Sequence, residues 1–353
     1  MKYPALDVTI DQLLQEGTVI PAHPLALKED LQLDEKRQRR LTQYYIASGA
    51  GGVAVGVHTT QFEIRNAGIG LLEPVLRMAA EEIEHAALKR SFIKVAGIVG
   101  PTEQAIREAK LAAQYGYHLG LVSMGGLKDY SEAQLIERAR AIAGIIPVFG
   151  FYLQPAVGGR LLSYDFWCAL AEIPNLQAIK VAAFNRYQTL DVVRAVCQSA
   201  RRDKIALYTG NDDNIVADLL TPYRLMVNGK QVEKNFVGGL LGHWAVWTHA
   251  AVKLLEEIRS GKKDQQQIQR LLSEGVKVTD MNAVIFDAKN SFKGCIPGIH
   301  EVLRRQGLLE GTWCLNPHEQ LSPGQREEID RVCQHYPEYT DDAFVKTFLQ
   351  SHR

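Results

Sequence analysis

The sequence has no excess of charge of either sign. Forty lysines and arginines balance 40 aspartates and glutamates, so the formal net charge is zero. A protein that holds nucleic acid through the phosphate backbone needs a surplus of cations. The charge balance therefore argues against a nucleic-acid-binding protein with a broad basic surface.

Long apolar runs are also missing. No stretch reaches the ~18 to 20 consecutive apolar residues that a membrane helix needs, and residues 1–7 contain no apolar segment of the kind found in signal peptides. The expectation is a protein without a membrane partner.

Cysteine is scarce. The five cysteines are scattered, and no two of them have Cys-x-x-Cys spacing. This pattern predicts reduced thiols in a cytoplasmic protein, and neither a disulfide framework nor a zinc site. Because 46% of the residues are hydrophobic and 23% are charged, the composition is that of a globular protein, either an enzyme or a binding protein for small molecules.

What the sequence does contain is a regular alternation of short apolar runs and amphipathic segments. The apolar runs have little alternation of their own, which is typical of parallel strands covered on both faces. We expect strands at residues 18–21, 52–56, 93–97, 117–123, 146–151, 176–180, 205–209 and 236–239. Helix-start signals stand between them at Asp34, Pro74, Ser131 and Ser163.

Eight strand–helix units of about 30 residues each predict an α/β fold, the (β/α)8 barrel. No Gly-x-Gly-x-x-Gly follows the first strand, which counts against a doubly wound dinucleotide-binding sheet. The barrel should occupy residues 1–260. Residues 261–353 predict a C-terminal helical extension packed on the barrel, with helices at 265–276, 279–290, 297–306, 322–335 and 341–350.

Catalytic side chains of such barrels lie at the carboxyl ends of the strands. Lys180 is the most informative residue there, since it ends an apolar strand. Burial disfavours the ammonium form, and a neutral amine is the nucleophile that condenses with a carbonyl. The alternative is a lysine paired with an acid at the barrel mouth.

Other strand ends also carry polar groups, each with a structural alternative. Tyr152 is a candidate proton shuttle or an aromatic cover on the core. Thr59 and Thr60 can hold a carboxylate through hydroxyl and N–H groups, or they can close a turn. Asp212 is a candidate ligand contact, although the sequence Gly-Asn-Asp-Asp-Asn around it equally favours a turn and helix cap.

Four stretches stand in an order and at a spacing that resemble a known family. The sequence has His-Thr-Thr-Gln-Phe at 58–62, Tyr-Leu-Gln-Pro at 152–155, Ile-Lys at 179–180 and Gly-Asn-Asp at 210–212. They resemble the Gly-Thr-Thr-Gly-Glu, Tyr-Asn-x-Pro, Ile-Lys and Gly-x-Asp stretches of the dihydrodipicolinate synthase and N-acetylneuraminate lyase family. The similarity extends over about residues 15 to 255, and the helical tail is similar to the family's C-terminal helices.

The resemblance implies a class I aldolase-type lyase with no cofactor and no metal. Lys180 would form an imine with pyruvate or a related 2-oxo acid, and the derived enamine would add to, or be released from, an aldehyde partner. Tyr152 would carry protons with Thr60 as a relay. Thr59 and Thr60 would hold the carboxylate.

The same resemblance assigns further substrate contacts to Arg160, Asp212 and His58, and it implies a homodimer or homotetramer. Departures from the family pattern indicate a divergent member. Gln61 and Phe62 replace the loop glycine and glutamate, and Val157 stands closer than Arg160 to the place of the family's arginine. An additional stretch at 221–234 is a candidate lid.

Two other functions stay open. The substituted Gln61-Phe62 loop is compatible with a non-catalytic barrel that binds a small acid. The histidines at three strand ends, His23, His58 and His243, raise the possibility of a metal-dependent hydrolase, but they lack a His-x-His motif or a local carboxylate.

Overall fold

A computed structural model describes residues 3–351 of the chain. The chain packs into two compact units. Unit 1 combines the residues up to Thr18 with Ile93–Leu240. Unit 2 combines Val19–Phe92 with the residues from Leu241 onward.

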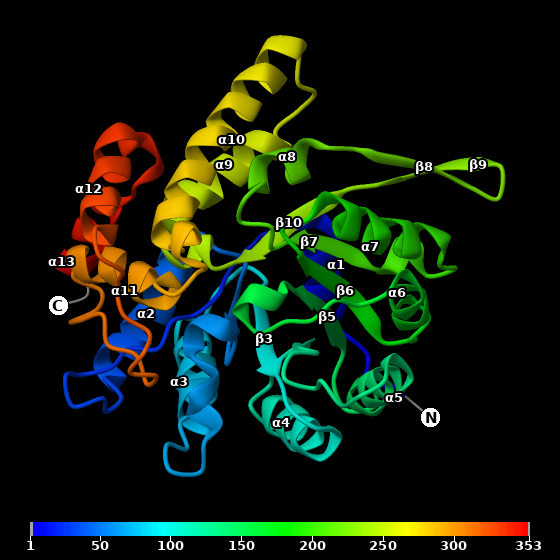
Figure 1. The fold of residues 1–353 in the computed structure, drawn as a ribbon, viewed down its shortest axis with the longest axis horizontal. Coiled ribbons are helices and arrows are strands. Elements are labelled where there is room, and N and C mark those ends of the chain that lie inside the picture. The colour runs from blue at the N-terminus through cyan, green and yellow to red at the C-terminus, as the bar shows by residue number, and fades with distance from the viewer. Residues whose placement is uncertain (1–2, 352–353) are drawn as a thin grey trace. The chain divides into compact units, whose positions relative to one another are not determined.

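The fold class is the predicted (β/α)8 barrel, because eight parallel strands alternate with helices along the chain (Figure 1). All eight expected strands are confirmed, with ends shifted by a few residues. They are β1 (Val19–Pro21), β2 (Gly52–Val55), β3 (Ile93–Ile98), β4 (Leu119–Val122), β5 (Val148–Leu153), β6 (Leu176–Ala182), β7 (Ala206–Thr209) and β10 (Phe236–Leu241).

Within unit 1, each of the strands β3 to β7 pairs in parallel with the next, and β10 pairs with β7. The Ser131 capping box is confirmed, since Ser131 accepts from the Gln134 N–H and Gln134 accepts from the Ser131 N–H. Ser163 caps the next helix. The helices of unit 1 are α1 (Val8–Glu16), α4 (Thr102–Gln114), α5 (Glu132–Ala143), α6 (Tyr164–Ala171), α7 (Arg186–Gln198) and α8 (Ile215–Leu220).

The additional stretch after α8 is an antiparallel hairpin, β8 (Tyr223–Val227) and β9 (Lys230–Lys234). Its turn residues Asn228 and Gly229 both have positive φ, 49° and 75°. Asn-Gly is the preferred pair for such a turn, and this signal was overlooked in the sequence. The hairpin packs along α7, as Figure 1 shows, and Lys234 donates to the Arg202 carbonyl at 2.7 Å.

Unit 2 holds β1, β2 and seven helices among the described residues. The prediction of two helices at 265–276 and 279–290 was wrong, because the single helix α10 runs from Gln265 to Ile285 across the expected break. No proline interrupts it, and Leu271, Val278 and Ile285 keep one buried stripe at a spacing of seven residues. The helices are α2 (Glu35–Ala47), α3 (Leu72–His85), α9 (Thr248–Arg259), α10 (Gln265–Ile285), α11 (Cys295–Arg305), α12 (Gln325–His335) and α13 (Asp342–Ser351).

Asp341, just before α13, joins the C-terminal helices to the rest of unit 2. Its carboxylate accepts from the Tyr44 hydroxyl of α2 at 2.6 Å and from the His249 N–H of α9 at 3.1 Å. The C-terminal helices therefore belong to the same compact unit as α2 and α9. The domain boundary at residue 260 stays a prediction from sequence.

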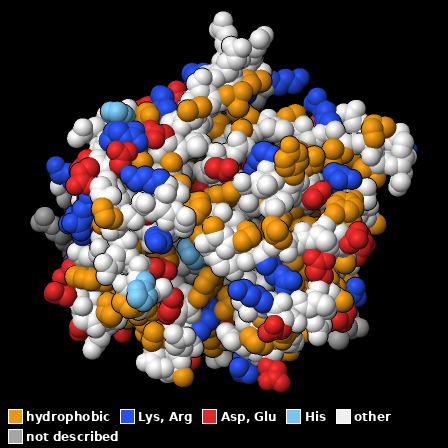
Figure 2. Space-filling view, in the orientation of Figure 1, with side chains coloured by type: hydrophobic (Ala, Val, Ile, Leu, Met, Phe, Trp, Pro, Cys, Tyr) orange, Lys and Arg blue, Asp and Glu red, His pale blue; other side chains and the backbone are white. Residues whose placement is uncertain are grey.

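Acidic and basic side chains are interspersed on the surface that Figure 2 draws, without a broad field of one sign. This distribution agrees with the zero net charge. Across residues 3–351, the structure contains no helix that is both long and apolar enough to cross a membrane.

The Ser131 cap offers a test of the local folding argument. We expect Ser131→Ala to lower the free energy of unfolding by about 1 kcal/mol, because it leaves an α5 N–H group without its acceptor. Urea denaturation followed by circular dichroism measures the change. Ser273→Ala, at an exposed position inside α10, serves as the control and should be nearly neutral; equal losses would contradict a specific cap.

Candidate active site

Lys180 lies near the carboxyl end of β6, between Phe151 of β5 and Tyr208 of β7 in the strand register. Its side chain is only 8% exposed. The amine nitrogen Nζ stands 4.4 Å from the centre of the Phe151 ring. The predicted nucleophile is therefore a buried lysine whose neighbour on the same face of the sheet is an aromatic ring.

Burial lowers the pKa of Lys180 to about 8, against the opposing attraction of the Asp212 carboxylate. An ordinary lysine has a pKa near 10.4. The shift matters chemically, because a much larger fraction of the amine is neutral and nucleophilic near neutral pH.

Gly210, directly after β7, makes room for the lysine. A Cβ atom built on Gly210 would lie 2.6 Å from Cε of Lys180 and 2.9 Å from Cβ of Ala182. Such distances are too short for any larger residue without a shift of Lys180. The glycine of the Gly-Asn-Asp stretch thus sets the path of the lysine side chain.

Tyr152 points to the opposite face of β5 from Phe151, as alternation along a strand requires. Its ring centre lies 5.0 Å from that of Trp167 on α6. The hydroxyl is buried near the Leu162 backbone without hydrogen-bond geometry, and burial raises the pKa of Tyr152. The structure thus brings Phe151, and not Tyr152, to Lys180; the proton-shuttle role of Tyr152 stays a prediction.

Arg160 and Asp212 take different positions in unit 1. Arg160 follows the short helix η3 (Pro155–Val157) and donates to the carbonyls of Leu127 and Tyr130 at 2.7 and 3.1 Å. It therefore holds the segment that follows β4. Asp212 lies in the turn after β7 and is close enough to Lys180 to act on its charge.

The threonines belong to unit 2, where they lie in the short helix η1 (His58–Thr60). The Thr59 hydroxyl donates to the Ala22 carbonyl at 2.9 Å. The Thr60 hydroxyl donates to the His23 carbonyl at 2.7 Å and accepts from the Gly56 and Val57 N–H groups. Both hydroxyl protons are thus already donated to carbonyls of the segment after β1, and carboxylate binding by these residues stays a prediction.

Gln61 ends this turn with a positive φ of 66°. Its side-chain oxygen accepts from the Leu315 N–H at 2.6 Å, which ties the loop after β2 to the segment between α11 and α12. His58 packs near Phe62, with ring centres 5.9 Å apart. The sequence marks Gln61 as a substitution in the family pattern, but no local signal in it points to the contact with Leu315.

The three histidines that suggested a metal-dependent hydrolase, His23, His58 and His243, do not form a metal-binding cluster. His23 is fully buried and bonds to the Pro24 carbonyl and the Thr42 hydroxyl through its two ring nitrogens. Burial lowers the pKa of His23 and of His243 to about 4. Within the described part of the chain, no three His, Cys, Asp or Glu side chains are arranged to hold a metal ion.

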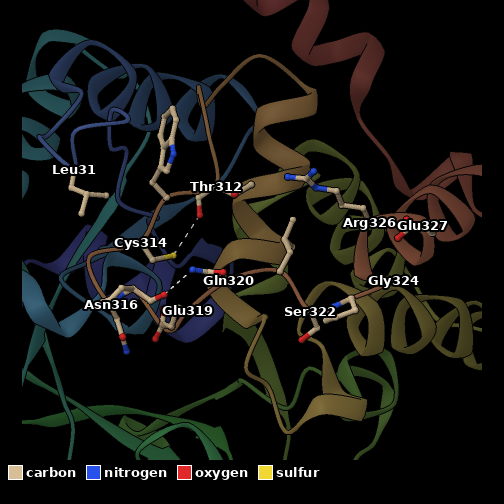
Figure 3. A pocket seen from close by; sticks show the side chains of 14 residues that line it. Leu31, Thr312, Cys314, Asn316, Glu319, Gln320, Ser322, Gly324, Arg326 and Glu327 are labelled. Carbon is tan, nitrogen blue, oxygen red and sulfur yellow. Dashed lines mark hydrogen bonds between the residues drawn. The ribbon is translucent and has the colours of Figure 1, made fainter.

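Unit 2 also contains an open cavity of about 620 Å³, formed mainly by residues 312–327 (Figure 3). Burial raises the pKa of Glu319 to about 7, and the nearby Glu63 carboxylate adds to the rise. None of the site residues predicted from sequence lines this cavity.

A barrel of parallel strands with a buried, weakly basic lysine at a strand end defines the class: a barrel enzyme with an amine nucleophile. The sequence model of the Dihydrodipicolinate synthetase family matches residues 16–336. The chain belongs to this family. It is accordingly an enzyme of the lyase, aldolase type.

The relatives are distant. The chain is 25% identical to the N-acetylneuraminate lyase of Salmonella paratyphi B over 289 residues, which is 81% of this chain and 85% of that lyase. It is 30% identical to the 4-hydroxy-tetrahydrodipicolinate synthase of Aromatoleum aromaticum over 203 residues, 57% of this chain and 64% of that synthase.

Solved structures agree with the fold. Dihydrodipicolinate synthase from Oceanobacillus iheyensis matches with a TM-score of 0.71 at 20% identity, covering 93% of this chain and 99% of that one. N-acetylneuraminate lyase from Fusobacterium nucleatum, complexed with pyruvate, matches with a TM-score of 0.69 at 17% identity, covering 92% and 98%.

The low pKa of Lys180 predicts selective acylation. With limiting acetic anhydride at increasing pH, the acylation rate of Lys180 should rise with a midpoint near pH 8, because only the neutral amine reacts. Mass spectrometry of digested protein measures each site. Lys277 is the control, since hydrogen bonds to Glu274 and Glu338 raise its pKa; a higher midpoint for Lys180 than for Lys277 would contradict the assignment.

Proposed function

We propose that the protein forms a Schiff base between Lys180 and pyruvate or a related 2-oxo acid, and uses it to make or break a carbon–carbon bond. One observation carries the proposal: Lys180 is 8% exposed at the end of β6, and burial lowers its pKa to about 8. Membership of the family supports it, since the curated relatives include an N-acetylneuraminate lyase and a 4-hydroxy-tetrahydrodipicolinate synthase.

The chemistry follows from a neutral amine. Lys180 Nζ attacks the ketone carbon of the 2-oxo acid, and the carbinolamine loses water to give an imine. The imine withdraws electrons from the neighbouring carbon, which then loses a proton to give an enamine. The enamine carbon adds to an aldehyde in synthesis, and the reverse sequence releases the aldehyde in cleavage.

The remaining site roles are proposals from the family pattern. Asp212 has the best physical support, because its carboxylate acts on Lys180 and can accept a proton during imine formation. Arg160, His58, Thr59 and Thr60 are proposed substrate contacts. For the two threonines, backbone N–H groups are better suited than hydroxyls that already donate to carbonyls.

Assembly and location are proposed on the same basis. We propose a homodimer or homotetramer in the cytoplasm, with a small 2-oxo acid and an aldehyde as the molecules that it binds. The reaction needs no cofactor, because the lysine itself supplies the electron-withdrawing imine.

A second candidate function is a barrel that binds a small acid without turnover. The packing of Phe151 against Lys180, and of Tyr152 against α6, favours it, because an aromatic hydrocarbon cannot transfer protons. Thermal stabilisation of the protein by a 2-oxo acid, with neither turnover nor a trapped adduct, would identify this function; turnover would exclude it.

Borohydride trapping tests the Schiff base directly. Incubation with pyruvate and borohydride should place a reduced adduct on Lys180, because the hydride fixes the imine as a stable secondary amine. Mass spectrometry of peptides locates it. Lys180→Arg should abolish the adduct.

Lys234 provides a matched control for this experiment. It is also a lysine of unit 1 whose pKa is lowered by burial, but its amine donates to the Arg202 carbonyl. Lys234→Arg should leave trapping unchanged. Trapping on Lys234, or on no lysine with any of a panel of 2-oxo acids, would contradict the proposal.

The substitution Tyr152→Phe tests whether Tyr152 of β5 transfers protons in the reaction of Lys180. We expect the rate of trapping to change by less than about tenfold, because Tyr152 packs against α6 and not against Lys180. Loss of a true general acid–base costs about 10² to 10⁴-fold. A loss of that size with unchanged folding would establish the proton-shuttle role and overturn the positional argument.

A further inference from the structure

Asp218 is a buried carboxylate that the proposed chemistry does not use. It lies on the short helix α8 with its side chain fully buried. Its oxygen Oδ2 accepts from the Thr209 hydroxyl at 2.7 Å and from the Asn211 side-chain amide at 2.9 Å. The cluster therefore links α8 back to the end of β7.

The second oxygen, Oδ1, has its own set of donors. Arg186 at the start of α7 forms an ion pair with it. The Asn214 amide donates at 3.2 Å and the Tyr223 hydroxyl at 3.3 Å. Because both oxygens accept and neither donates, an amide placed here would set its NH2 group against donors.

Asn211 connects the Asp218 carboxylate to the loop after β6, the strand that contains Lys180. Its side-chain oxygen accepts from the Phe184 N–H at 3.0 Å. Phe184, four residues after Lys180, has a positive φ of 50°, a backbone conformation that is strained for a residue with a Cβ atom. The hydrogen bond that the Phe184 N–H donates to Asn211 helps to hold this backbone conformation.

Asn211 also belongs to the loop after β7, which contacts the Lys180 side chain through Gly210. Gly210 precedes Asn211 and packs against the Lys180 side chain, leaving no room for a Cβ atom. Asp212, the next residue, acts on the charge of the amine. The loop that follows β7 borders Lys180 and is held by the Asp218 carboxylate, which also reaches the loop after β6 through Asn211.

We propose that Asp218 is a positioning residue for the Lys180 amine, which it serves by locking the loops after β6 and β7 so that the amine stays shielded from water. The proposal rests on the Schiff-base function proposed above. Asp218 acts through Asn211 and need not touch the substrate.

A purely structural role predicts a different result. An anchor for α8 alone would change the stability of the fold but not the titration of Lys180. The groups facing Lys180 within unit 1 are the uncharged ring of Phe151, Tyr208 and Asp212. The Tyr208 hydroxyl donates to the Leu14 carbonyl at 2.9 Å, so Asp212 is the charged neighbour that any readout must take into account.

The test is the pH dependence of Lys180 acylation and of pyruvate trapping in Asp218→Asn. We expect the acylation midpoint to rise from about 8 by about one unit, because water reaches the amine and its burial decreases. The trapping rate well below the midpoint should fall about tenfold, as the neutral fraction does. Loss of a nearby carboxylate alone would move the midpoint down, so the sign identifies loosening.

Asn211→Ala breaks the same link without changing a charge, and it should move the midpoint in the same direction. It also carries the test if Asp218→Asn does not fold. Glu233→Gln is the control, since it removes an exposed carboxylate paired with Arg224 on the hairpin; it should have no effect.

Folded Asp218→Asn or Asn211→Ala protein with an unshifted acylation midpoint would overturn the proposal. Because acylation does not require the 2-oxo acid, this failure is distinct from failure of the proposed function. Absence of pyruvate trapping in the unmodified protein, with a normal acylation midpoint, would overturn the Schiff-base function alone.

Discussion

The burial of one lysine side chain at an apolar strand end is the constraint on which the rest of the site depends. Removing an ammonium group from water is costly, so burial lowers the pKa of the amine and favours its neutral form. The burial around Lys180 favours the neutral amine, and the Asp212 carboxylate opposes it in part. Phe151 offers an aromatic face, Gly210 offers empty space, and Asp212 keeps one opposing charge close.

Such a site needs rigid walls, because water entering along the lysine would restore its ordinary basicity. The loop after β6 contains a strained backbone at Phe184, and the loop after β7 contains the glycine that touches the lysine. Strain of this kind persists only where surrounding contacts determine the backbone. The hydrogen bonds of Asn211 and Asp218 supply such contacts.

The strands and Lys180 could be predicted because their signals are local. Short apolar runs at a repeat of about 30 residues define the barrel, and Lys180 interrupts one such run at its end. The side to which Tyr152 points could not be predicted in the same way. Shifting a strand by one residue exchanges its two faces, so Phe151 and Tyr152 were distinguishable only once the ring contacts were known.

Other parts of the site depend on partners that are remote in the chain. The hydroxyls of Thr59 and Thr60 donate to carbonyls almost 40 residues earlier, and no local pattern reveals this. Asp218 was hidden for another reason: four of its five donors are near it in the sequence, but only the folded loops bring them all to one carboxylate. The Asn228-Gly229 turn, by contrast, was a local signal that simply went unused.

The hydrogen bond between Gln61 and Leu315 joins residues 254 positions apart. During synthesis on the ribosome, the loop after β2 emerges long before its partner, so it cannot take up its final backbone until the segment near Leu315 has been made. The two ends of unit 2 are separated by nearly all of unit 1. The loop that the family pattern places at the substrate is thus held in part by a segment that is synthesised about 250 residues later.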